Sequence, residues 1–120
     1  MMRKKVLIVD DEPEVVDFLE RFLQRHGIDV VKATSGAAAI ESYNMHHPDC
    51  TFLDVTMPDK DGLSVLKEIK RINPLSRVMM ITGKEEKEYQ ERAKKYGAFD
   101  YITKPLDLEE LDRKVKQYIL

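Results

Sequence analysis

Short apolar runs alternate with longer amphipathic stretches along the whole chain. The apolar runs are only a few residues long and contain many β-branched side chains, which is typical of β-strands. We predict strands at Lys5–Asp10, Ile28–Ala33, Cys50–Asp54, Arg77–Thr82 and Phe99–Thr103.

The stretches between these runs carry apolar residues at the spacing of amphipathic helices. Pro13 suits the first turn of the first helix, and Gly27 marks its end. Ser35 is expected to cap the second helix. The face of the first helix that we expect to be buried consists of Val15, Phe18, Leu19, Phe22 and Leu23. The other helices are predicted at 37–46, around 65–72, at 85–96 and at 108–119.

Five strands, each followed by a helix, predict a parallel sheet with right-handed crossovers and helices on both faces. The runs Val6–Val9 and Val78–Ile81 are continuously apolar, as expected of strands that are covered on both faces. Runs 28–33 and 99–103 contain charges, which fits the edges of a sheet. We therefore predict an α/β domain with a doubly wound, flavodoxin-like (βα)5 sheet in the order 2-1-3-4-5. In such sheets ligands bind beyond the carboxyl ends of the strands, at the switch point between strands 1 and 3.

Composition narrows the classes of protein to consider. The 120 residues suffice for one domain, and the net charge of −2 leaves no basic surface for a nucleic-acid backbone. The first apolar run ends at Asp10, too early for a secretory or membrane segment. Cys50 is the only cysteine, which excludes an internal disulfide and suits a reducing compartment. We expect one cytoplasmic domain over 1–120, with no effector domain in this chain and no contact with nucleic acid or membrane.

Polar groups stand at the carboxyl ends of the predicted strands. Asp10 and Asp11 follow the first strand, and Asp54 ends the third. Carboxylates that converge repel one another unless a cation neutralises them, and Mg²⁺ prefers oxygen ligands. Thr82 and Lys104, from the fourth and fifth strands, would add a hydroxyl donor and a positive charge. An aspartate beside a metal, a cation and a hydroxyl is suited to accepting a phosphoryl group.

In these motifs the chain resembles the receiver domains of two-component response regulators, of the single-domain chemotaxis type. The resemblance runs from about Lys4 to Ile119 and covers essentially the whole chain. The matching segments, in the family's order and spacing, are Val6–Glu12, Leu53–Gly62, Met80–Gly83 and Gly97–Pro105.

The resemblance implies a role for each residue of the site. It implies that Asp54 is the phosphoacceptor and that Asp11 binds Mg²⁺ directly, with Asp10 acting mostly through water. The backbone carbonyl of Thr56 would supply another oxygen to the metal. By the same resemblance Thr82 is the switch hydroxyl, Lys104 is the phosphate-binding lysine and Tyr101 is the switch aromatic.

The resemblance also implies the partners. A histidine kinase or a histidine phosphotransfer protein would donate the phosphoryl group, and the domain would slowly remove it again without being a turnover enzyme. The fourth helix, fifth strand and fifth helix would pass the signal to a downstream protein or effector domain. Asp100 and Lys114 match in part the ion pair of dimerising members, so a phosphorylation-dependent homodimer is a further expectation.

Three other functions fit the sequence less well than a phosphorylatable receiver does. A receiver-like interaction module that never needs phosphate should have lost the acidic residues, which are all present. A flavodoxin-like FMN carrier would have hydroxyl side chains and glycines at positions 10–12 to bind the phosphate. This chain has acidic residues there, and they would repel a phosphate. A phosphatase with an aspartate nucleophile usually has a second aspartate two residues later, where this chain has Thr56.

Overall fold

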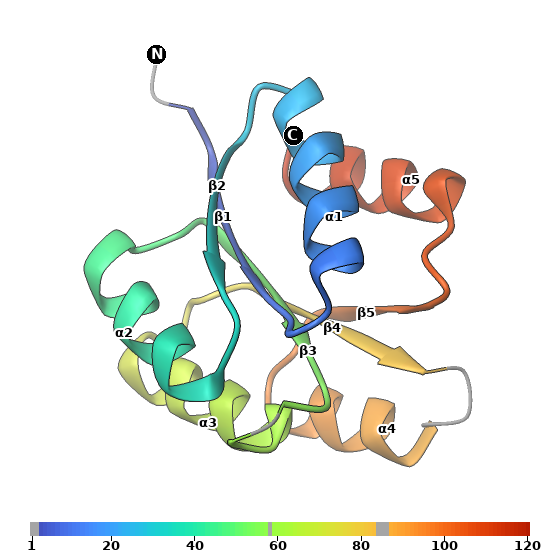
Figure 1. Cartoon of the computed structure of the whole chain (residues 1–120). Coiled ribbons are helices and arrows are strands. Elements are labelled where there is room, and N and C mark those ends of the chain that lie inside the picture. Colours follow the sequence, from blue (N-terminus) through green and yellow to red (C-terminus); the bar gives the residue numbers. More distant parts are fainter. Residues whose placement is uncertain (1–2, 58, 84–86) are drawn as a thin grey trace.

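The computed structural model describes residues 3–57, 59–83 and 87–120. These residues form a five-stranded parallel sheet in the order β2-β1-β3-β4-β5, as the sequence predicted (Figure 1). The charged strands are the two edges, and the continuously apolar strands lie inside the sheet. The strands are β1 (Lys5–Val9), β2 (Asp29–Ala33), β3 (Cys50–Asp54), β4 (Val78–Gly83) and β5 (Asp100–Lys104).

Helices cover both faces of the sheet. Helices α1 and α5 pack on one face, called the α1/α5 face, and α2, α3 and α4 pack on the other, called the α2–α4 face (Figure 1). The helix predicted at 85–96 begins outside the described residues, and its described part ends close to the predicted end. The helices are α1 (Pro13–Arg25), α2 (Gly36–His46), α3 (Gly62–Ile72), α4 (Lys87–Lys95) and α5 (Leu108–Tyr118).

Side chains at the helix N-termini explain where several helices begin. Pro13 opens α1, and the Ser35 hydroxyl accepts a hydrogen bond from the Ala38 N–H at 3.1 Å, as predicted. The carboxylate of Asp59, from the loop after β3, also accepts hydrogen bonds from the first N–H groups of α2, at 2.8 and 3.1 Å. The carboxylate of Asp61 caps α3 by accepting a hydrogen bond from the Leu63 N–H at 2.9 Å. The loop that follows Asp54 is therefore tied to the N-termini of two helices.

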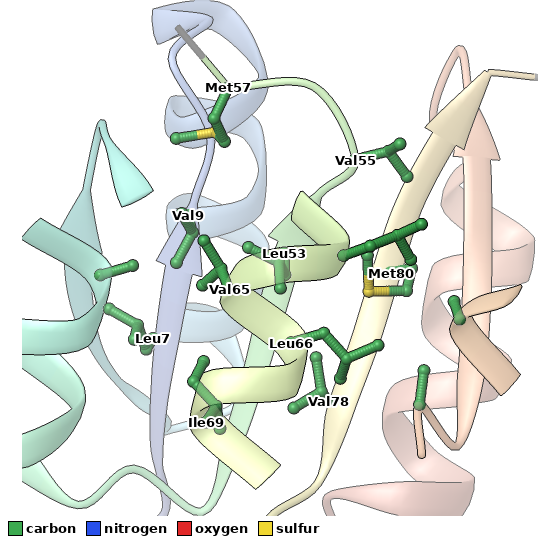
Figure 2. Close-up of a cluster of buried hydrophobic side chains, with 14 of the residues drawn as sticks. Leu7, Val9, Leu53, Val55, Met57, Val65, Leu66, Ile69, Val78 and Met80 are labelled. Carbon is green, nitrogen blue, oxygen red and sulfur yellow. The ribbon is translucent and has the colours of Figure 1, made fainter. Parts of the chain in front are cut away.

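Alternate residues of each strand point to opposite faces, so the sheet has two cores. Met79, Ile81 and Ile102 lie with the residues of α1 and α5. Figure 2 shows the other core, in which side chains of α3 pack onto the middle strands. The labelled residues of that core are Leu7, Val9, Leu53, Val55, Met57, Val65, Leu66, Ile69, Val78 and Met80.

The expected buried face of α1 is wrong in part. Val16 is buried and Phe18 is 38% exposed, whereas the sequence pattern favoured Val15 and Phe18. One residue turns a helix by about 100°, and both valines are apolar, so periodicity alone does not choose between the two stripes. Packing on the sheet selects the stripe through Val16 and leaves Phe18 at the rim, beside Leu108.

Cys50 is buried on the α1/α5 face, and burial raises the pKa of its thiol to about 12. Cys50 therefore acts as a small buried apolar side chain. Within the described ranges, no helix has the length and the apolar character needed to cross a membrane.

Candidate functional site

The site forms where two neighbouring strands send the chain in opposite directions. From β1 the chain passes to α1 on one face, and from β3 it passes to α3 on the other. The two connections diverge and leave a crevice beyond the strand ends. A hollow of about 400 Å³ lies there, and Asp11, Glu12, Asp54, Thr56, Gly83 and Lys104 border it.

Three carboxylates meet beside this hollow. Asp10, Glu12 and Asp54 each offer an oxygen, and these oxygens lie within 4.8 Å of one another. Asp10 is fully buried, Asp54 is 6% exposed and Glu12 is exposed. The Glu12 N–H donates to Oδ1 of Asp10 at 2.9 Å, which folds the chain back at the end of β1. This turn holds the Asp10 carboxylate against the backbone of Glu12.

The second oxygen of Asp10 reveals what the cluster can hold. Oδ2 of Asp10 is buried and accepts no well-formed hydrogen bond from any residue that the structure describes, although Nζ of Lys104 lies 3.2 Å away as an ion pair. That ammonium is shared among three carboxylates, so it offsets only part of the cost of burying this oxygen. Its neighbours are two more carboxylates, and hard divalent cations prefer such oxygens. The residues present thus fit a metal ion or a metal-bound water at this oxygen.

Lys104 brings positive charge to the cluster. Its Nζ lies 2.6 Å from Oε1 of Glu12, 3.2 Å from Oδ2 of Asp10 and 3.5 Å from Oδ2 of Asp54. Burial alone would lower the pKa of Lys104, but the hydrogen bond that it donates to Glu12 and the charges of Asp54 and Asp10 raise this pKa above its ordinary value. One ammonium group cannot balance three carboxylates, so the ionised site remains negative and favours a divalent cation.

The surroundings of Asp54 perturb its carboxyl group. Burial first, and then the nearby charge of Asp10, raise its pKa to about 6, although Lys104 and the Thr56 N–H oppose the shift. The Thr56 N–H donates to Oδ1 of Asp54 at 3.3 Å. Asp54 is therefore ionised at neutral pH, but at a cost to the folded protein.

The turn after β3 depends on a glycine. Thr56 forms an isolated antiparallel bridge with Asp61, and the Gly62 N–H donates to the Val55 carbonyl at 2.8 Å. A Cβ on Gly62 would lie 2.3 Å from the backbone oxygen of Asp54, so no larger residue fits without a shift. This close approach brings α3 directly under the loop and orients the backbone around Thr56.

The structure brings most of the predicted site residues together. Asp10, Asp54 and Lys104 are in mutual contact, and Thr56 borders the same hollow. Asp11 is exposed and borders the hollow, but it is not one of the three clustered carboxylates among the described residues. Glu12 takes that place, although the sequence analysis gave it no role of its own. Its position two residues after Asp10 was the available signal.

Thr82 and Tyr101 lie on the other side of the sheet. Thr82 is 1% exposed and follows Met80 on the α2–α4 face, where the Gln90 side chain donates a hydrogen bond to its hydroxyl at 3.2 Å. The Tyr101 ring is partly buried against the same core. Side chains alternate along β5, so Tyr101 lies on this face and Lys104 on the opposite one.

Two lysines flank the Tyr101 ring. Nζ of Lys94, from α4, and Nζ of Lys114, from α5, lie 5.6 and 5.1 Å from the ring centre. Lys114 also donates to the Tyr101 carbonyl and pairs with Asp100 at 3.3 Å. The residues expected to pair between copies of the chain therefore pair with each other inside this chain.

Comparisons with known proteins agree with this geometry. The family described as response regulator receiver domain matches residues 6–116. The chain is 36% identical over 115 residues to the alkaline phosphatase synthesis transcriptional regulatory protein PhoP of Bacillus subtilis, which covers 96% of this chain and 48% of PhoP. The chain thus spans about half the length of that relative.

Two further matches extend over nearly the full length of both chains. The chain is 32% identical over 119 residues to the sporulation initiation phosphotransferase F of Bacillus subtilis, covering 99% of this chain and 96% of that protein. A putative response regulator from Chloroflexus aurantiacus superposes with a TM-score of 0.91 at 29% identity, covering 98% of both chains.

Proposed function

We propose that this chain, which belongs to the response regulator receiver domains of two-component systems, is a phosphorylation-dependent switch. Receiver domains are signalling domains rather than turnover enzymes, and they interact with histidine kinases or phosphotransfer proteins. In this proposal such a partner transfers a phosphoryl group onto Asp54 in the cytoplasm. The observation that carries it is the buried Asp54 carboxylate, held beside the buried carboxylate of Asp10 and the ammonium of Lys104.

The metal in the proposal is Mg²⁺. Asp11, Asp54 and the Thr56 carbonyl would hold it, with Asp10 acting mostly through water. The buried Oδ2 of Asp10, which shares one ammonium with two other carboxylates, and the excess of carboxylates over cations support this choice. When bound, Mg²⁺ supplies positive charge that offsets the charge on a transferring phosphoryl group.

The chain's own groups account for the remaining chemistry. An Oδ atom of Asp54 attacks the phosphorus of a phosphohistidine, the P–N bond breaks, and the leaving imidazole takes up a proton. Lys104 already lies between Asp54 and Glu12, so a small movement would bring its ammonium to a phosphoryl oxygen. A pKa of about 6 leaves Asp54 ionised and nucleophilic at neutral pH.

The output in this proposal is the surface made by α4, β5 and α5. Thr82 would turn to donate a hydrogen bond to the phosphoryl group, and the Tyr101 ring would move into the space behind it. A downstream protein or effector domain would read that change. A phosphorylation-dependent homodimer would exchange the Asp100–Lys114 pair within the chain for a pair between copies.

Phosphorylation with a small donor tests the proposal. Incubation with acetyl phosphate and Mg²⁺ should add one alkali-labile phosphoryl group, seen by intact-mass measurement. Asp54→Asn should abolish the addition, whereas Asp59→Asn, in the exposed loop that follows, should retain it. Unchanged mass of the natural chain would favour a phosphorylation-independent interaction module. Equal labelling of Asp54→Asn would show that another residue is the acceptor.

A further inference from the structure

Gln90 contacts the switch hydroxyl, although nothing in the sequence singled it out. Its Nε2 donates a hydrogen bond to Oγ1 of Thr82 at 3.2 Å, from α4 to the end of β4. We propose that Gln90 is a latch that holds the Thr82 hydroxyl away from Asp54 in the resting protein and so sets how readily the switch operates. This inference rests on the proposed function and concerns its regulation.

The two faces of the sheet explain why a latch can act here. Ile81 is level with Asp54 in the strand register and lies in the core of the α1/α5 face. Met80 lies in the core of the α2–α4 face, and Thr82 shares its direction by strand alternation. The resting hydroxyl therefore points toward α4. To reach an oxygen carried by Asp54 it must rotate toward the strand end and leave Gln90.

Because Thr82 is buried, Gln90 and a phosphoryl oxygen compete for its hydroxyl group. Thr82 is 1% exposed, so a hydroxyl that leaves Gln90 gains little from water. In place of the hydrogen bond that it accepts from Gln90, the hydroxyl would then donate one to a charged phosphoryl oxygen, and hydrogen bonds to charged groups are the stronger ones. The Gln90 contact thus disfavours rotation in the resting protein but yields to a phosphoryl group.

The same hydrogen bond connects the site to the helix next to Tyr101. Within the described part of α4, Lys87–Lys95, Ala93 is the one buried residue. Few apolar contacts therefore hold this helix, and a partly buried hydrogen bond near its start contributes much to its position. Release of Gln90 would loosen α4 at the moment that Thr82 turns, and α4 also carries Lys94, which lies over the Tyr101 ring.

Beryllofluoride, which mimics a phosphoryl group on an aspartate, provides the test. We expect Gln90→Ala to bind beryllofluoride with Mg²⁺ about three- to tenfold more tightly than the natural chain, the range that one ordinary hydrogen bond predicts. The affinity is measured by titration, followed through the amide resonances of the loop after Asp54. Gln117→Ala, the same replacement at an exposed position of α5, is the matched control and should leave the affinity unchanged.

A double-mutant cycle separates the latch from a general effect on the helix. In a Thr82→Val background, which removes the hydroxyl but keeps the shape, Gln90→Ala should change the affinity less than twofold. Thr82→Val should also shift the side-chain amide resonances of Gln90 before any beryllofluoride is added.

Unchanged or weaker binding by Gln90→Ala would overturn the latch, as would equal tightening in both backgrounds. A natural chain that fails to bind beryllofluoride at all would overturn the proposed function itself. The two failures are therefore distinguishable.

Discussion

Replacing the buried carboxylate of Asp54 with a neutral amide should stabilise the metal-free protein. Asn has nearly the same shape as Asp, so Asp54→Asn removes a charge without opening a cavity. In the structure that charge is buried beside Asp10, and only part of the resulting cost is offset by Lys104. We expect the variant to resist unfolding better than the natural chain in magnesium-free buffer at neutral pH.

The size of the effect follows from the pKa of Asp54, which is raised from 3.8 to about 6. Each pKa unit corresponds to about 1.4 kcal/mol, so the shift is worth at most about 3 kcal/mol. The folded protein binds this proton more tightly than the unfolded chain does. The natural chain therefore loses stability as the pH rises from about 4 to about 6, and the loss then levels off. The Asn variant has no such loss.

Urea unfolding in the presence of a chelator, at pH 4, 5.5 and 7.5, measures this difference. The free energy of unfolding of the variant, minus that of the natural chain, should grow by up to about 3 kcal/mol across the series. Asp59→Asn is the control, and it should lower the free energy of unfolding where Asp54→Asn raises it. The N–H groups of Gly36 and Ala37 lower the pKa of Asp59, so this carboxylate stabilises above about pH 4, and its contribution disappears as the pH falls through the lowered pKa. A gap for Asp54→Asn that is flat with pH, or a less stable variant at pH 7.5, would refute the reasoning.

Two further changes test the metal and the turn. Millimolar Mg²⁺ should raise the melting temperature of the natural chain. Asp11→Asn should raise the melting temperature measured without metal but abolish the response to Mg²⁺. A persistent response would remove Asp11 from the metal site. Gly62→Ala should lower stability by about 1–3 kcal/mol in urea unfolding, because the new Cβ would meet the Asp54 carbonyl oxygen at 2.3 Å. Wild-type stability in Gly62→Ala would mean that the loop adapts without strain.

Much of the fold was predictable because local patterns and topology agree. The charges of Asp29 and Lys32 are tolerated at an edge strand, and the continuous apolar run of Val6–Val9 needs cover on both faces. These two features indicate the strand order, and parallel strands bring their carboxyl ends to one edge of the sheet. Asp10 and Asp54 could therefore be placed together from residues far apart in the sequence.

The features that the sequence did not predict depend on how a helix is rotated about its axis and on contacts between residues far apart in the chain. A polar helix such as α4 presents several side chains to solvent, and periodicity does not say that Gln90 is the one that reaches Thr82. Ser35 was recognised as a cap because it adjoins its helix, whereas Asp59 caps the same helix from a distant loop. The pairing of Glu12 with Lys104 likewise depends on how two loops meet.

The most direct test of the account maps amide resonances with and without beryllofluoride and Mg²⁺. The central claim is that a phosphoryl group on Asp54 changes the surface on the far side of the sheet. The account predicts large shifts at Thr82, along α4 over Lys87–Ala93 and at Tyr101, and it predicts that Thr82→Ala uncouples them from the binding site. Shifts confined to the strand-end loops around Asp11 and Asp54 would contradict the switch and leave only a phosphate-binding site.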